Sequence, residues 1–196
     1  MSWVNWFPEF GSDQYLKATV ESVFFQHQYY RLWSTLFVHA DSAHLLSNLI
    51  LFIPLIYLVS IYFGSYFLPV ISIFFGGLTN AVVLQTLPEK VALVGISGVV
   101  NWLGAFWLVL FYLIDRRESR RRRFAICLFI TLLLFVPDTY KPDVSYLSHL
   151  VGYALGLLTG VIYFLFNQIR FEKAEVFEEE EPSTEPLLPL DWNHSP

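Results

Sequence analysis

Two side chains capable of nucleophilic and acid–base chemistry lie inside apolar stretches of this sequence. Ser97 stands between two glycines in Gly95-Ile96-Ser97-Gly98, and His149 lies near the start of the last apolar run. A serine hydroxyl in hydrocarbon has no water to satisfy it, and an ionisable side chain in a membrane segment is a functional hypothesis by default. Since serine with histidine is the smallest set that makes a nucleophile, we predict that Ser97 and His149 work as a pair.

A second polar cluster is expected at the same level as this pair. His44 and Asn48 lie one helical turn apart on a single face of an apolar run. Acyl transfer needs hydrogen-bond donors that point at a developing oxyanion, and this cluster could supply them. Asn48 could also simply hydrogen-bond between helices, so the pattern leaves both interpretations open.

The sequence does not predict a metal site. His39, His44 and His149 are possible zinc ligands, but no His-Glu-x-x-His pattern and no carboxylate partner accompany them. Cys127 is the single cysteine, which excludes an internal disulfide and a cysteine-based metal site. We therefore expect neither a metal nor another cofactor.

The composition indicates which elements must position these residues. The 196 residues are 55% hydrophobic and only 15% charged, and the mean hydropathy is +0.50. A soluble domain would carry about 25% charged residues. The chain is therefore predicted to be all-α, a polytopic bundle of membrane-spanning helices.

Five apolar runs are expected to be spans, although the fourth is short for one. In the last run, glycine recurs every four residues at Gly152, Gly156 and Gly160, which predicts a groove where a neighbouring helix packs closely. The helix bearing Ser97 is the expected neighbour, so the groove would bring His149 to Ser97. The expected spans are residues 43–63, 66–87, 91–114, 124–136 and 144–169.

The flanking segments differ from this core. Residues 1–28 contain no span and no export signal, and they are expected to lie at the membrane interface through Trp3, Trp6 and Phe7. Residues 29–170 form the expected membrane domain. Residues 171–196 contain eight acidic residues and one basic residue, and they are predicted to be a disordered cytoplasmic tail.

Six arginines crowd into residues 115–123, between the third and fourth expected spans. Such a cluster could bind nucleic acid, but between two spans it is typical of a cytoplasmic topology anchor. With this loop inside the cell, Ser97, His149 and His44 all fall near the outer face. The expected location is therefore the cell (inner or cytoplasmic) membrane.

Taken together, these residues resemble the rhomboid intramembrane serine proteases over about residues 30–160. Tyr30-Arg31 is similar to the Trp-Arg pair in the first external loop of that family, and His39 followed by His44 and Asn48 has the family's spacing. The segment from Gly95 to Gly98 resembles its nucleophile motif. The segment from His149 to Gly152, with Gly156, resembles its final core helix.

The resemblance implies a Ser-His dyad without a third carboxylate and without a cofactor. Ser97 would attack a peptide carbonyl in a transmembrane substrate, and His149 would take the proton. His44, Asn48 and the backbone N–H of Ser97 would stabilise the oxyanion. Membrane proteins and lipids would be the partners, nucleic acid would not, and the oligomeric state is not determined. Supporting roles fall to Arg31, Gly95, Gly98, Asn101, Gly152 and Gly156.

Two departures from the family pattern leave alternatives open. Asn101 replaces a tyrosine one turn after the nucleophile, so either Asn101 hydrogen-bonds His149 or Tyr153 or Trp102 supplies a ring. The first of the family's six core spans is missing, which suggests a five-span variant or a start further upstream. The competing function is that of a non-catalytic rhomboid-like protein that binds and escorts membrane helices. A channel is disfavoured because the spans lack charged residues at their midplane.

Overall fold

The computed structural model describes residues 13–63, 67–135 and 145–174, and this part of the chain is predominantly helical. Within these ranges, extended backbone pairs at one isolated antiparallel bridge between Ala18 and Leu93. The prediction of an all-α fold is confirmed. The elements are α1 (Asp13–Leu16), η3 (Glu21–Phe25), α2 (Arg31–Ser34), η4 (Thr35–Phe37), α3 (Ser42–Phe63), α4 (Phe67–Leu84), α5 (Ser97–Ile114), α6 (Arg120–Leu134) and α7 (Tyr146–Ala174).

Three of the described helices, α3, α5 and α7, are long and apolar enough to cross a membrane. The other two expected spans correspond to shorter helices. The apolar part of α4 covers Leu68–Leu84, and α6 has 15 residues, of which the first four are arginines. Because a span needs about 17 to 25 apolar residues, the three long helices support a multi-pass membrane protein, whereas α6 is shorter than this minimum.

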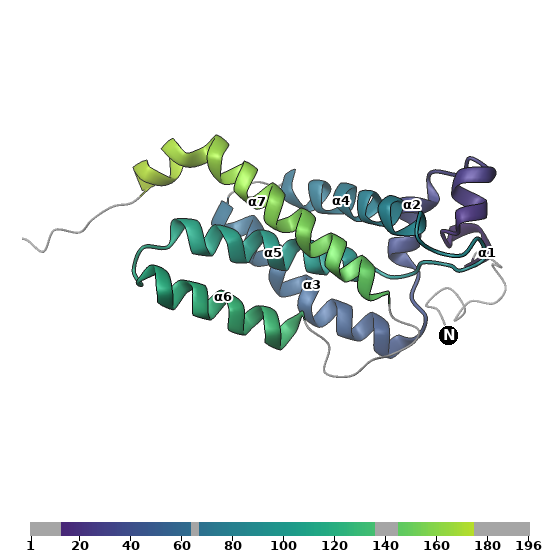
Figure 1. Ribbon diagram of the computed structural model, residues 1–196, viewed down its shortest axis with the longest axis horizontal. Coiled ribbons are helices and arrows are strands. Elements are labelled where there is room, and N and C mark those ends of the chain that lie inside the picture. Colours follow the sequence, from purple (N-terminus) through teal and green to yellow (C-terminus); the bar gives the residue numbers. More distant parts are fainter. Residues whose placement is uncertain (1–12, 64–66, 136–144, 175–196) are drawn as a thin grey trace, which may run out of the picture. The chain divides into compact units, whose positions relative to one another are not determined.

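The helix that begins with Ser97 lies at the centre of the first compact unit, residues 1–166. α5 packs against α3, α4 and α6, and it lies behind α7 in Figure 1. In α5, 61% of the span is buried inside the protein, compared with 17% in α3 and in α7. The ring of Trp102 stacks on Phe75 and Phe106, with centroids 5.3 and 5.0 Å apart. Packing on several sides therefore fixes this helix.

The outer helices present apolar side chains away from the core. Along α3 an exposed stripe follows the helical repeat, because every third or fourth residue is large and apolar. An apolar surface of this extent would be an aggregation hazard in water, but it matches the hydrocarbon of a bilayer. The stripe consists of Leu46, Ile50, Ile53, Tyr57 and Ile61.

Two helix starts differ from the sequence prediction. α5 begins at Ser97 rather than Val91, because Gly95 has a φ of +102° and Leu93 pairs with Ala18. A positive φ is incompatible with a right-handed helix. α6 begins at Arg120, four residues earlier than expected, since the Ser119 hydroxyl accepts a hydrogen bond from the Arg122 N–H and caps the helix.

The amino-terminal segment contributes to the core where it is described. Ala18 and Val23 are fully buried and belong to one apolar cluster with Leu32, Leu84 and Leu93. The interfacial residues Trp3, Trp6 and Phe7 and most of the acidic tail lie outside the described residues. In the second compact unit, residues 167–196, α7 continues to Ala174 and the Gln168 amide donates to Glu172 at 2.9 Å.

Candidate active site

Ser97 is the first residue of α5 and follows directly on a sharp turn. The turn is made by Gly95, whose φ of +102° a residue with a side chain rarely adopts. The first N–H groups of a helix have no partner within the helix. The backbone amide of Ser97 is one of these N–H groups. The partly buried Ser97 side chain therefore lies at the end of the helix where backbone N–H groups have no partner within the helix.

Thr35 holds the loop that precedes Ser97, a role that the sequence analysis missed. Its hydroxyl donates to the carbonyl oxygen of Leu93, and its own carbonyl accepts from the Gly95 N–H at 3.1 Å. The Ala18 N–H donates to the Thr35 hydroxyl at 3.3 Å, and Thr35 is fully buried. The loop is therefore fixed by hydrogen bonds from two distant segments. A threonine in an aromatic surface loop gives no local signal of this.

His44 and Asn48 lie beside Gly95, as the sequence predicted for one polar layer. A methyl group built on Gly95 would be 2.9 Å from His44 Cε1 and 3.7 Å from Asn48 Nδ2. The Asn48 side-chain nitrogen is buried and has no hydrogen-bond partner among the residues that the structure describes. A buried donor without a partner costs about 1–3 kcal/mol of stability. An oxyanion-binding site contains such a donor, which gains its partner only when substrate binds.

The start of α3 is held in place by Asp41. Its carboxylate accepts a hydrogen bond of 2.7 Å from the backbone N–H of His44. This bond lowers the pKa of the exposed Asp41 carboxyl, because it favours the charged form. The helix turn that carries His44 is thereby capped.

The glycine face of α7, which follows His149, packs against the helix that begins with Ser97. A side chain on Gly152 would collide with the carbonyl oxygen of Gly98, and one on Gly156 would collide with that of Trp102. The His149 ring is partly buried and lies edge-on to Tyr146, with centroids 6.0 Å apart. No hydrogen bond joins the Ser97 hydroxyl to the His149 imidazole in the described residues.

A small cavity of about 40 Å³ opens beside Ser97. Ser148 also faces Gly98, where an added methyl group would be 3.3 Å from the Ser148 hydroxyl oxygen. The volume suits one or two waters. Polar residues from four segments line it: His44, Asn80, Ser97, Ser145 and Ser148.

Asn101, Tyr153 and Trp102 were the residues expected to contact His149, but their hydrogen bonds and ring contacts join them to other residues. The Asn101 amide donates to the Ser97 carbonyl oxygen of its own helix at 2.9 Å. The Tyr153 hydroxyl bonds to Thr131 at 2.6 Å, and the Trp102 ring stacks on Phe75 and Phe106. The aromatic neighbour of His149 is thus Tyr146, three residues before it, which the sequence analysis did not consider.

Arg31 and His39 support the loop around the site. Arg31 is buried, and its guanidinium donates to the Lys17 carbonyl oxygen at 3.0 Å. His39 is only 3% exposed and lies edge-on to His44, with ring centroids 5.3 Å apart. Burial, together with the neighbouring His44, lowers the pKa of His39 to about 4. At neutral pH His39 is therefore an uncharged packing partner of His44.

Among the described residues, no group of three or more His, Cys, Asp or Glu side chains is arranged to hold a metal ion.

In comparisons with known proteins, the family model described as the Rhomboid domain matches residues 26–166. No curated protein and no solved structure matches the chain. The matched region covers every residue of the candidate site, from Arg31 to Gly156.

Proposed function

Because the chain belongs to the rhomboid family, we propose that it is an intramembrane serine protease with Ser97 as nucleophile and His149 as general base. The observation that supports this most directly is the contact of Gly152 with Gly98. It joins the helix of the base, three residues after His149, to the helix of the nucleophile, directly after Ser97. The unpartnered amide of Asn48 beside Gly95 adds an oxyanion donor to the same place.

In the proposed reaction the Ser97 hydroxyl oxygen attacks the scissile carbonyl carbon while His149 accepts the hydroxyl proton. The negative charge that develops on the carbonyl oxygen is stabilised by Asn48, His44 and the Ser97 N–H. Collapse of this intermediate breaks the C–N bond, and His149 donates the proton to the leaving amine. Water, activated by His149, then hydrolyses the acyl ester on Ser97.

The proposed substrate class is supported by where these residues lie along their helices. His44, Ser97 and His149 all occur in the first turns of helices that can cross a membrane, α3, α5 and α7. The arginine-rich loop follows the other end of α5. We propose that the enzyme cleaves transmembrane segments of other proteins near the outer face, with the arginine loop in the cytoplasm.

The orientation is tested with single cysteines in a Cys127→Ala background. A cysteine at Lys90, before α5, should react with a membrane-impermeant thiol reagent in intact cells, whereas a cysteine at Arg116, after α5, should react only after permeabilisation. Both positions are exposed. The reverse pattern would place the site at the cytoplasmic face.

A second candidate function is that of a non-catalytic relative that binds and escorts membrane helices. The lack of a hydrogen bond between Ser97 and His149 favours it, although such bonds often form only when substrate binds. A fluorophosphonate probe separates the two functions. The protease should be labelled covalently at Ser97, and Ser97→Ala should abolish the label. A folded, unlabelled wild-type protein that still retains a membrane-helix client would support the escort function instead.

A further inference from the structure

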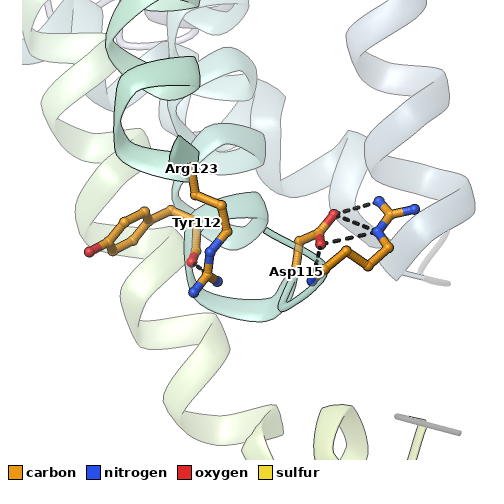
Figure 2. Close-up of polar contacts among 4 residues, drawn as sticks. Tyr112, Asp115 and Arg123 are labelled. Atoms are coloured by element: carbon orange, nitrogen blue, oxygen red, sulfur yellow. Dashed lines mark hydrogen bonds and ion pairs between the residues drawn. The ribbon is translucent and has the colours of Figure 1, made fainter. Parts of the chain in front are cut away.

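The six arginines in the loop after α5 and the first turn of α6 are not equivalent in the structure. Arg123 is buried, donates to the Tyr112 carbonyl oxygen at 2.6 Å, and lies over the Tyr112 ring (Figure 2). Arg123 therefore ties the start of α6 to the end of α5. Its guanidinium group thus makes these contacts within the protein.

Two other arginines are paired with acidic side chains. Arg117 binds the Asp115 carboxylate through two nitrogens, with the shortest distance 2.5 Å (Figure 2). Arg122 pairs with Glu118 at 2.8 Å, one turn before it. Both pairs are partly exposed, but each cancels one positive charge locally.

Arg120 and Arg121 differ from these. Both are exposed, and in the part of the chain that the structure describes neither is paired with an acidic side chain. Ser119 caps the first turn of α6, so its backbone N–H groups are partly satisfied from within the protein. The guanidinium groups of Arg120 and Arg121 are thus two positive charges that remain available to an external anion.

An exposed apolar face continues along α6 from these arginines. Phe124, Leu128 and Leu132 are three, seven and eleven residues after Arg121, so all four lie on one side of the helix. The three apolar side chains are 59%, 47% and 55% exposed. A guanidinium next to an apolar strip is complementary to a phospholipid, because the guanidinium can bind the phosphate and the strip can contact the acyl chains.

We propose that Arg120 and Arg121, with this face of α6, form a binding site for an anionic phospholipid of the surrounding bilayer. The guanidinium fork matches phosphate oxygens in a bidentate manner. Nucleic acid fits less well, because the contiguous apolar strip would gain nothing from it. This site is independent of the proposed protease chemistry, since it lies at the opposite end of α5 from Ser97.

The test uses the full-length protein in detergent and counts bound lipid by native mass spectrometry. Phosphatidylglycerol and phosphatidylcholine with the same acyl chains are offered together. Each basic residue near an anionic surface contributes on the order of a fivefold preference, so wild type should favour phosphatidylglycerol by about tenfold or more. Arg120→Gln with Arg121→Gln should reduce this preference to near unity.

Arg117→Gln with Arg122→Gln is the matched control, because it removes the same charge from the paired arginines. This variant should retain most of the preference. Equal losses in the two double variants would reduce the effect to net charge and overturn the site. Displacement of the lipid by millimolar inorganic phosphate would also overturn it, because the acyl strip would then contribute nothing. Thermal unfolding checks that both variants are folded.

Discussion

Gly152 of α7 lies so close to the carbonyl oxygen of Gly98 in α5 that no side chain fits between them. Gly98 directly follows the proposed nucleophile, and Gly152 follows the proposed base by three residues. The distance between the two helix backbones is therefore what sets the distance between Ser97 and His149. Membrane helices reach such approach only where both faces are small.

Leucine in place of Gly152 should separate the two helices. Inserted bulk in a well-packed contact costs about 1–3 kcal/mol, and activity should be lost before the fold is. Thermal unfolding and cleavage of a model transmembrane substrate measure the two effects. Ala154→Leu is the control, because it adds a larger side chain to the exposed side of the same helix. Equal behaviour of the two variants would contradict the contact.

Ser97→Ala and His149→Ala should each abolish turnover, and the double variant should be no worse than either single variant. Residues that act as one catalytic unit are strongly non-additive. The measurement is kcat with a purified single-pass substrate in liposomes. Additive losses, or substantial turnover by His149→Ala, would remove the dyad assignment.

Asn48→Ala should lower kcat by roughly 100- to 1000-fold, the usual effect of losing one oxyanion donor. KM should change little, since the oxyanion exists only in the transition state. Ser47→Ala is the control, because the Ser47 hydroxyl is exposed and bonds to the His44 carbonyl oxygen of its own helix at 2.9 Å. If Asn48→Ala keeps full kcat, Asn48 only joins helices.

Thr35→Val should impair the site without touching substrate. It leaves the Leu93 carbonyl oxygen and the Ala18 N–H without their partner, which costs about 1–3 kcal/mol for a buried group. We expect slower fluorophosphonate labelling of Ser97 because the loop before it loosens. Ser34→Ala serves for comparison, since Ser34 bonds to the Leu16 carbonyl oxygen at 2.9 Å and not to this loop. Equal labelling rates in the two variants would show that the effect of Thr35→Val does not come from the loop before Ser97.

Stability should fall in mild acid through His39. Its pKa of about 4 in the folded protein lies below the 6.5 of the unfolded chain. The unfolded state therefore binds more protons between these values, so the contribution is complete above pH 6.5 and is lost as the pH falls towards 4. The loss is on the order of 1–3 kcal/mol.

Thermal unfolding from pH 7.5 to 4.5 measures this change. His39→Gln removes the titrating group, so its unfolding temperature should vary less with pH than that of wild type. His44 and His149 remain in both proteins. Parallel curves would show that His39 is not the group responsible.

The sequence alone was sufficient for the membrane class and the all-α fold, and it predicted the residues that could do chemistry. These depend on local properties: the length of an apolar run, a serine between glycines, and glycines repeated every four residues. The four-residue repeat even predicted the helix that α7 would meet, because small side chains on one face have a single structural consequence in a membrane.

Only the tertiary structure decided how the nucleophile is held. The start of α5 at Ser97 depends on the bridge from Leu93 to Ala18 and on the hydroxyl of Thr35, which is 58 residues before the carbonyl that it binds. The partner of Asn101 and the ring beside His149 were likewise undetermined. A hydrogen bond across such a separation leaves no periodic trace in the sequence, since either group could be satisfied by many others until the chain is folded.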